Sequence, residues 1–298
     1  MSDVTAAGGN GVVDATIHDI GYRRYDGRLL GDAGSARALY WQGFRALFGL
    51  GRGARSKAAP VLVLAGTLLP ALAMVTAATA SGGMVPLANG NLLESQILMY
   101  SLFVAAQGPE ILSRDQQQRV LPLILTRQIT RNTYAAARFA ALWSGLFIIV
   151  LAPPLLMYLG EIGGAKEPAV VFEKMGGKIW PILAHATITS FVVGSLSALL
   201  SALTPRRAYA TAAIIATLLV TTVVSVGVDE LAGSGSRVAE LISPVRTLVT
   251  QAKLLFGEQT RAMTINPPLP IGNYVMYLVG LGSVMLALYV VRIRQVRV

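Results

Sequence analysis

Six long apolar runs divide the chain. The first, residues 59–80, contains no charged side chain, and at about 1.5 Å per residue it would form a helix of about 33 Å. That length crosses a hydrocarbon core of about 30 Å, whereas a helix in a soluble core seldom stays apolar on all faces for so long. We therefore predict an all-α integral membrane protein with six transmembrane helices, at residues 59–80, 92–107, 139–160, 179–203, 211–228 and 271–291.

Two different patterns precede the first apolar run. Residues 1–34 offer few apolar side chains to offset the entropy of ordering, so we expect a cytoplasmic tail or, alternatively, a partly ordered docking segment. Residues 35–58 place aromatic side chains at helical spacings and arginines on other faces, which predicts an amphipathic helix in the inner-leaflet interface. A cytosolic helix packed on another protein is the alternative. The aromatic residues expected at the interface are Tyr40, Trp41, Phe44 and Phe48.

Apolar and polar residues alternate in the segment between the fifth and sixth runs. Its apolar residues recur at helical spacings, and Pro244 interrupts them. This pattern predicts two short amphipathic helices that lie on the outer leaflet or dip into it. Residues 59–298 would then form one six-span transmembrane domain.

Composition and charge fix the orientation. Charged residues make up 13% of the chain, against roughly 25% in soluble domains. The net charge of +10 does not require nucleic acid, because basic residues in a membrane protein mark the cytoplasmic side. Most of the 25 Lys and Arg residues lie in segments that share a side with the N-terminus. We therefore expect a plasma-membrane protein with both termini in the cytoplasm.

Small polar residues gather in the fourth and fifth runs. They favour close helix packing, and the sharper alternative is a polar substrate pathway lined by Thr187, Ser190, Thr221 and Thr222. We expect His185 to have a packing role or to reach the interface. Arg138 stands at the end of a run, where a long side chain commonly reaches the interface.

The motifs of common enzymes are missing from the sequence. It contains no G-x-x-x-x-G-K-[ST] phosphate loop and no H-E-x-x-H or G-x-S-x-G motif. With no cysteine and only two histidines, it lacks a usual zinc set. Few carboxylates fall within the apolar runs, which argues against an ion-driven carrier. We expect no enzymatic activity and no bound cofactor or metal in this chain.

Residues 108–138 carry five arginines between the second and third runs. Apolar and charged residues alternate there in a helical pattern, as in two short helices with a charged side towards the cytosol. One interpretation is that the arginines only determine topology. The order of the residues carries more information: Asp115 is followed by Val120-Leu121, then by the aliphatic Leu123-Ile124-Leu125, by Ile129-Thr130-Arg131, and by Arg138 seven positions later.

This order resembles the cytoplasmic loop of permease subunits of type-2 ATP-binding-cassette (ABC) exporters. That loop reads as an acidic residue, Glu-Arg-Gly-Thr-Leu, an aliphatic run, Pro-x-Ser-Arg and a further basic residue. Arg119 stands here in place of the glycine and Gln128 in place of the proline. Residues 21–27, GYRRYDG, are similar to the N-terminal region of permeases from high-GC, actinobacterial-like sources.

The resemblance implies a mechanism. Such permeases form dimers and bind two separate ATPase subunits, which hold ATP and Mg, and the loop between spans 2 and 3 is the coupling helix that contacts them. The interfacial helix moves with it. Because the predicted spans are aliphatic, with only 7% aromatic residues in the chain, the cargo is expected to be hydrophobic, lipid-like or drug-like. Homo- and heterodimers, a non-transporting mechanical or sensory complex, and a stand-alone secondary transporter stay open. The residues expected to contact the ATPase are Glu110, Arg114, Asp115, Gln118, Arg119, Arg127 and Arg131.

Overall fold

The protein is helical throughout the part of the chain that the structure describes, with no strand among those residues. This structure is a computed structural model, and the described residues are 31–81, 89–118, 124, 129–165, 167, 169–170, 173, 176–204, 206–232, 237–258 and 268–295. Five of its helices are long and apolar enough to cross a membrane. They are α2 (Ala54–Ala80), α6 (Arg131–Gly163), α8 (Ile179–Leu203), α9 (Arg207–Leu231) and α13 (Ile271–Gln295).

These five helices confirm the all-helical, multi-pass character that the apolar runs predict. The bounds of α8 equal the predicted run, while the other four helices extend beyond theirs into charged residues. The extension follows from backbone chemistry, because a helix that leaves the apolar layer keeps its hydrogen bonds and only its side chains change.

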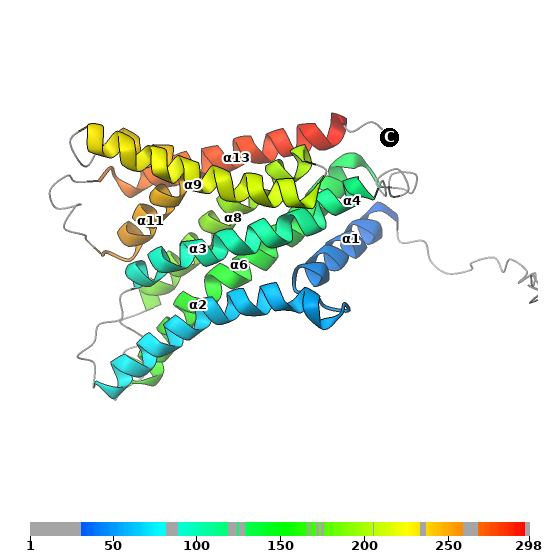
Figure 1. The fold of residues 1–298 in the computed structure, drawn as a ribbon. Coiled ribbons are helices and arrows are strands. Elements are labelled where there is room, and N and C mark those ends of the chain that lie inside the picture. The colour runs from blue at the N-terminus through cyan, green and yellow to red at the C-terminus, as the bar shows by residue number, and fades with distance from the viewer. Residues whose placement is uncertain are drawn as a thin grey trace, which may run out of the picture. The chain divides into compact units, whose positions relative to one another are not determined.

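The predicted second span corresponds to α3 (Asn89–Ile111), which is more polar than the other five. It carries Glu94, Gln96, Gln107 and Glu110 along its length. Helix α3 is nevertheless central: it contacts α2, α6, α8 and α9. In Figure 1, α3 lies between α2 and α9, with α6 and α8 behind it.

Helix α1 (Gly31–Leu47) precedes α2. The helix expected at residues 35–58 thus begins earlier and ends at Leu47, and a turn follows before α2 begins at Ala54. Gly49 and Gly51 adopt positive φ angles of 63° and 81° in this turn, a conformation that glycine tolerates and other residues avoid. The backbone N–H of Leu50 closes the helix end by donating to the Arg45 carbonyl at 2.9 Å.

Two short helices, α10 (Arg237–Ile242) and α11 (Pro244–Leu255), occupy the segment between α9 and α13. The pair is present as the sequence predicts. A capped helix start lies at the junction between them. Ser243 is the N-cap of α11, and its hydroxyl accepts from the Arg246 N–H at 3.3 Å. Pro244 is the first residue of α11, where a proline costs no hydrogen bond.

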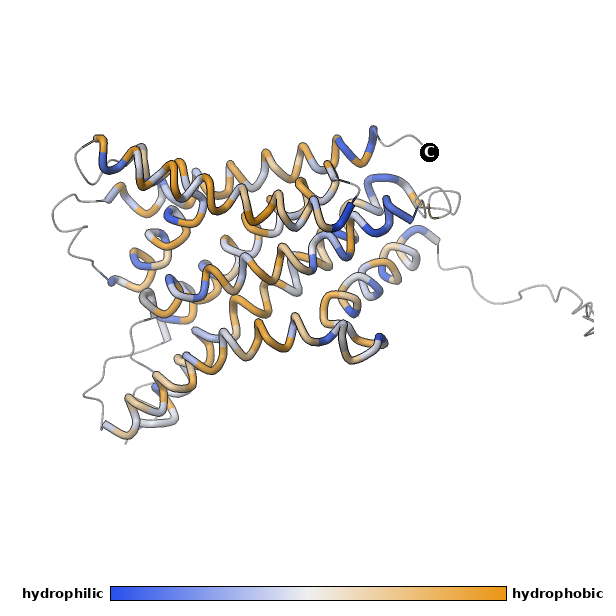
Figure 2. The backbone as a smooth tube through the Cα atoms, viewed as in Figure 1, coloured by the Kyte–Doolittle hydropathy of each residue, from blue (hydrophilic) through white to orange (hydrophobic). Residues whose placement is uncertain are grey.

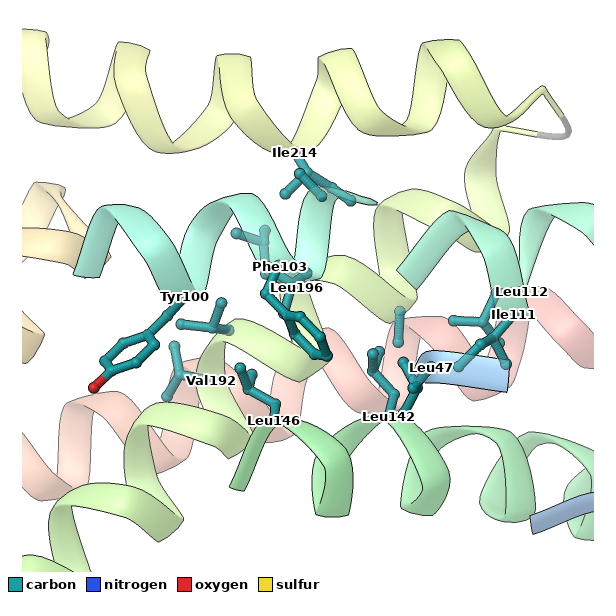
Figure 3. Close-up of a cluster of buried hydrophobic side chains, with 14 of the residues drawn as sticks. Leu47, Tyr100, Phe103, Ile111, Leu112, Leu142, Leu146, Val192, Leu196 and Ile214 are labelled. Carbon is teal, nitrogen blue, oxygen red and sulfur yellow. The ribbon is translucent and has the colours of Figure 1, made fainter. Parts of the chain in front are cut away.

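Large apolar side chains from most of the helices meet in one core, part of which Figure 3 shows. Buried members come from α1, α3, α6, α8 and α9, and α11 and α13 add Leu248, Leu278 and Tyr289. They include Leu47, Phe103, Leu142, Leu146, Val192, Leu196 and Ile214.

Lateral hydrogen bonds add to this packing. The Ser197 hydroxyl on α8 donates to the Val104 carbonyl at 3.1 Å, and the Thr211 hydroxyl on α9 donates to the Ala105 carbonyl at 2.8 Å. Small residues permit such close approach between membrane helices. Helix α3 is therefore held on several sides, and its charged C-terminal end is placed by the whole bundle.

Candidate functional site

Strongly hydrophilic residues gather where α3 and α4 (Ser113–Gln117) end and where α6 and α9 begin (Figure 2). The last turn of α13 lies at the same end, because Arg294 bonds to the first turn of α6. We call this region the basic end. Its described members in ion pairs or polar contacts are Arg52, Glu110, Arg114, Asp115, Arg131, Asn132, Tyr134, Arg138, Arg207 and Arg294.

At the basic end, Glu110 pairs with three arginines. Its Oε1 lies 2.6 Å from Arg52 Nη1 and 2.8 Å from Arg114 Nη1, and its Oε2 lies 2.7 Å from Arg207 Nη1. The three arginine side chains are 35%, 41% and 55% exposed, whereas that of Glu110 is 12% exposed. This Glu110 cluster (Arg52, Glu110, Arg114, Arg207) ties the turn before α2 and the start of α9 to the end of α3.

A second carboxylate, Asp115 on α4, is held from α6. Arg138 Nη2 donates to Asp115 Oδ2 at 2.6 Å, and the Tyr134 hydroxyl donates to the same oxygen at 2.9 Å. We call these three residues the Asp115 cluster. The expectation that Arg138 reaches the interface is wrong, because its side chain is only 4% exposed. A buried guanidinium needs an ion-pair partner, and Asp115 supplies it.

Close packing of α1 encloses the Asp115 cluster. Gly43 on α1 lies so near α6 that an added Cβ would stand 3.0 Å from Ala141 Cβ and 3.4 Å from Arg138 Nη1. The side chains that α1 buries, Leu39 and Leu47, lie on the same face as Gly43. Helix α1 therefore shields Arg138 from solvent and is coupled to α4 through it.

The start of α6 is also tied to the end of α13. Arg131 Nη1 donates to the Arg294 carbonyl, and Arg294 Nε donates to Asn132 Oδ1 at 2.8 Å. One turn further on, the buried Tyr289 hydroxyl donates to the Ala135 carbonyl at 3.3 Å. Polar contacts thus join α13, α6 and α4 at one level.

The structure distributes the arginine-rich stretch over three elements. Its first residues end α3, the next form α4, and residues from Arg131 onwards begin α6 rather than a separate loop helix. Of the residues expected to contact a partner, Glu110 and Asp115 face other side chains of this chain, while Arg114 and Gln118 are more exposed. Arg119 and Arg127 lie outside the described residues.

Four residues of these clusters were missed by sequence reasoning: Arg52, Tyr134, Arg138 as a buried partner, and Arg207. The available signal was position, since Arg52 and Arg207 stand directly beside apolar runs. Position alone does not show that both converge on Glu110, which is distant from each in sequence.

The aromatic residues of α1 form a chain of ring contacts. Tyr40 stacks on Phe44 with ring centroids 6.0 Å apart, and Phe44 lies 5.3 Å from Phe48. The Tyr40 hydroxyl donates to Ser144 Oγ on α6 at 3.0 Å. Trp41 lies edge-on to both Tyr40 and Phe44, with ring centroids 5.7 Å apart in each pair, and it is 48% exposed. Helix α1 thus buries one face on α6 and α3 and presents Trp41 outward.

The four candidate pathway residues hydrogen-bond within their own helices. The hydroxyls of Thr187 and Ser190 donate to the carbonyls of Leu183 and Thr187, and those of Thr221 and Thr222 donate to carbonyls one turn earlier in α9. Such bonds satisfy a hydroxyl inside an apolar layer without a partner helix. Thr222 also contacts Ser243 Oγ at 3.0 Å, which links α9 to the start of α11.

The opposite end of the helices, which we call the α11 end, contains a second polar group. His185 Nδ1 on α8 lies 3.3 Å from Gln251 Oε1 on α11, and it is buried, as a packing role predicts. Lys253 on α11 pairs with Glu94 on α3 at 2.5 Å, and Arg246 pairs with Asp229 on α9 at 2.9 Å.

Glu240 occupies the centre of the α11 end. The hydroxyls of Tyr274 and Thr250 donate to its two carboxylate oxygens, Tyr274 at 2.6 Å. These bonds connect α10, α11 and α13. The buried face of α11 is therefore polar and is matched by polar groups of its neighbours.

The chemistry of the basic end is electrostatic. Among the described residues, no group of three or more His, Asp or Glu side chains is placed to hold a metal ion. Both carboxylates of the basic end are held in arginine pairs. No protein-family model matches the chain, and no curated protein is significantly similar to it. Exposed guanidinium groups at such an end bind anions or acidic protein surfaces.

Proposed function

We propose that this chain is the membrane-spanning permease subunit of an ATP-driven exporter of the type-2 ABC class. It works with separate ATPase subunits, because the sequence has no phosphate loop of its own. The observation that carries the proposal is the pair of clusters at the basic end. Through Asp115 and Glu110, the short helix α4 and its surroundings are joined to α6, α9 and the turn before α2.

The Glu110 cluster and the Asp115 cluster together, which we call the joint, give a route for mechanical coupling. A force on α4 would act on Asp115, and the buried Arg138 would carry it to α6 and, through the close contact with Gly43, to α1. The Glu110 cluster would carry it to α9. Rigid helices that share such contacts move together, as coupling between distant sites requires.

We infer that α3 is the second of six spans. Its 23 residues give a length of about 34 Å, enough for the hydrocarbon core. Its polar groups are matched internally: Gln96 Nε2 donates to the Thr67 carbonyl at 2.8 Å, and the Tyr100 hydroxyl donates to Gln96 Oε1 at 2.7 Å. A buried, satisfied amide is tolerated in a membrane. An even number of spans would put both termini on one side, and the excess of basic residues at the basic end supports our proposal that this side is cytoplasmic and that the membrane is the plasma membrane.

The seven residues expected at the partner interface divide into two groups. Glu110 and Asp115 would act inside the chain, as anchors of the joint. The exposed Arg114 and Gln118 would meet the ATPase, together with Arg131 and with Arg119 and Arg127, which lie outside the described residues. Helix α1 would be the interfacial helix that moves with the joint. ATP and Mg would bind to the partner, and the permease would form a homo- or heterodimer.

One observation favours a second candidate, a non-transporting complex in which ATP-driven motion does mechanical or sensory work. Ser190, one of the residues considered for a pathway, is fully buried and bonded to its own helix. A transporter in this class would carry a hydrophobic, lipid-like or drug-like cargo at a seam between helices. A mechanical complex needs no such seam.

The test is purification of the full chain from native membranes in mild detergent. We expect an ATP-binding-cassette ATPase to co-purify, and its ATP hydrolysis to rise when the two are reconstituted in one membrane. The double variant Arg114→Ala/Gln118→Ala should weaken this association about tenfold, as loss of about 1.4 kcal/mol of contact would. It should leave membrane insertion unchanged.

Lys178→Ala provides the matched control, since it removes an exposed cation at the opposite end of α8. It should leave the association intact. Flux or activity of the chain alone, with no ATPase bound, would refute the proposed function. ATPase stimulation without movement of any hydrophobic cargo would favour the mechanical complex.

A further inference from the structure

The Glu110 cluster carries more positive charge than its single carboxylate balances. Three guanidinium groups share one carboxylate, so the cluster has two positive charges in excess. Each guanidinium presents a planar fork of N–H donors, and one carboxylate cannot accept from all three forks. The side chains of Arg52, Arg114 and Arg207 are also partly exposed. A second anion can therefore reach them.

The cluster stands at the margin of the apolar helices. Arg207 is the first residue of α9, Arg52 lies just before α2, and Glu110 is next to the last residue of α3. Nearby, Arg206 lies over the ring of the exposed Tyr209, 5.8 Å from its centroid. Arginine beside an exposed aromatic ring at a helix end is typical of the headgroup level of a bilayer.

An apolar strip leads away from the cluster along α3. Leu98 and Leu102 belong, with Glu110, to the row of every fourth residue along α3. This row winds around the helix by about 40° per step, so Leu102 stands about 80° and Leu98 about 120° around the axis from Glu110. At about 1.5 Å per residue they lie about 12 and 18 Å below Glu110, within or near one leaflet of a core of about 30 Å. Both are exposed, 38% for Leu102 and 56% for Leu98.

We infer that the Glu110 cluster binds the phosphate of an anionic phospholipid, whose acyl chains lie along the strip formed by Leu98 and Leu102. Guanidinium forks suit phosphate oxygens, and basic pockets at the cytoplasmic ends of membrane helices attract anionic headgroups. The ligand class follows from the arrangement, since the cluster offers donors to a charged head and the row of leucines beneath it offers apolar contacts to a tail.

Other occupants fit this surface less well. An acidic protein surface matches the charge of the arginines, but it would leave the apolar strip at membrane depth without a partner. A second copy of the chain in the same orientation would bring its own basic end to the same level, so like charges would oppose each other. The inference does not depend on an ATPase partner, and it is tested on this chain alone.

The experiment uses the purified full chain in mixed micelles of a detergent and zwitterionic phosphatidylcholine. Phosphatidylglycerol with the same acyl chains is titrated in, and the thermal unfolding midpoint gives its apparent affinity. We expect stabilisation by phosphatidylglycerol beyond that by additional phosphatidylcholine. Inorganic phosphate and glycerol phosphate, which lack acyl chains, should have a much smaller effect.

Variants at the cluster separate a built site from general attraction. Arg52→Gln/Arg207→Gln should weaken phosphatidylglycerol binding at least tenfold, because each arginine near an anionic headgroup adds appreciably to affinity. Arg37→Gln/Arg45→Gln removes the same charge from exposed positions on α1 and should change the affinity less than twofold. Equal losses in the two variants would overturn the inference, as would equal stabilisation by the two lipids.

A variant that is expected to bind the lipid more tightly separates loss of the site from misfolding. Glu110→Gln removes the competing carboxylate, so phosphatidylglycerol should bind several-fold more tightly and should stabilise this variant more than the wild type. A purely structural ion cluster predicts a destabilised variant that the lipid does not rescue, which would contradict the site.

The strip is tested separately. Leu98→Ser/Leu102→Ser should weaken phosphatidylglycerol binding several-fold and leave the small response to glycerol phosphate unchanged. Leu102→Cys reports on the competing occupant: efficient disulfide cross-linking between two copies, unaffected by phosphatidylglycerol, would show that a second chain covers the strip and would overturn the inference.

Discussion

At the basic end, Glu110 meets three arginines, whereas at the α11 end Arg246 and Asp229 form a one-to-one pair. The described cations outnumber the anions at the first end, and the reverse holds at the second, where Glu94, Asp229, Glu230, Glu240 and Glu258 accompany few cations. The second end also relies on hydroxyl and amide partners, such as Tyr274 and Gln251. The basic end therefore has positive charge in excess, whereas the α11 end also holds carboxylates through neutral donors, as Tyr274 and Thr250 hold Glu240.

The contrast separates two uses of polar groups in a membrane helix bundle. The polar contacts of α11 join it to α3, α8, α9 and α10, and they let a short helix with a polar face stay buried against five neighbouring helices. Contacts of the basic end connect long helices, and they leave donors for something else. We therefore interpret the α11 end as a fixed closure and the basic end as a joint with an open binding surface.

The largest test of this contrast is the buried arginine of the joint. Arg138→Met should lower the free energy of unfolding by about 3–5 kcal/mol, because it leaves Asp115 without its charge partner in a buried site. The measurement is a denaturant titration of the purified chain in mixed micelles. Arg114→Met, at a more exposed position in the same end, should cost no more than about 1 kcal/mol.

A companion variant identifies the cause. Arg138→Met/Asp115→Leu removes both charges and should recover part of the loss, since a matched apolar pair avoids the uncompensated carboxylate. If Arg114→Met and Arg138→Met cost the same, the Asp115 cluster is not a buried joint, and the contrast between the two arginines fails.

Helix approach at the two ends gives the second test. At Gly108, an added Cβ would stand 1.9 Å from Ser197 Oγ, whose hydroxyl bonds to α3, so the contact cannot relax without losing that bond. Gly108→Ala should therefore cost about 1–3 kcal/mol, as overpacking does. Gly90→Ala, at the α11 end, meets the flexible end of Glu258 and should cost less.

Both variants are measured by the same titration, with lipid composition held constant. A larger loss for Gly90→Ala would mean that the α11 end is the more rigid region. That result would reverse our assignment of the tight joint to the neighbourhood of α3 and α8.

The third test replaces one arginine by glutamine at each of the two ends. Arg246 donates to Asp229, to Ser225 Oγ at 2.9 Å and to the Ser225 carbonyl at 3.2 Å. Arg246→Gln should cost about 1–2 kcal/mol, because partners in a half-buried site lose their donor. Arg207→Gln should cost less than about 1 kcal/mol, since this more exposed cation shares Glu110 with two others. Equal costs would show that the spare charge of the basic end is structural.

Much of the fold follows from the apolar pattern, because helices are the simplest way to satisfy the backbone in hydrocarbon. The run at residues 179–203 gives the bounds of α8 directly. The predicted run at residues 92–107 is shorter than α3, which spans Asn89–Ile111. Gln96, inside that run, donates to the Thr67 carbonyl on α2, and no local pattern contains that information.

The site was predictable only in outline. The density of arginines located the basic end, and Asp115 was singled out by its position. Which carboxylate each arginine would choose depends on tertiary contacts: Arg52 and Arg207 approach Glu110 only after α2, α3 and α9 have packed. Burial of Arg138 depends equally on α1, whose Gly43 admits the close contact.

The two helix caps give the last test, with losses no larger than that expected for Arg246→Gln. Ser243 is fully buried, caps α11 and also contacts Thr222, whereas Thr130 is exposed and caps α6 by accepting from the Thr133 N–H at 3.2 Å. Ser243→Ala should cost about 1–2 kcal/mol, and Thr130→Ala about 0.5–1 kcal/mol. Both losses are read from the same denaturant titration.

The difference between the caps has a physical origin in solvent access. Water can replace the Thr130 hydroxyl at an exposed helix start, but it cannot easily reach the buried N–H groups at the start of α11. Hydrogen exchange of the first-turn amides of α11 should therefore quicken in Ser243→Ala, while those of α6 change little in Thr130→Ala. Faster exchange at α6 alone would mean that the α11 end is the looser of the two, and our picture of a fixed closure there would be wrong.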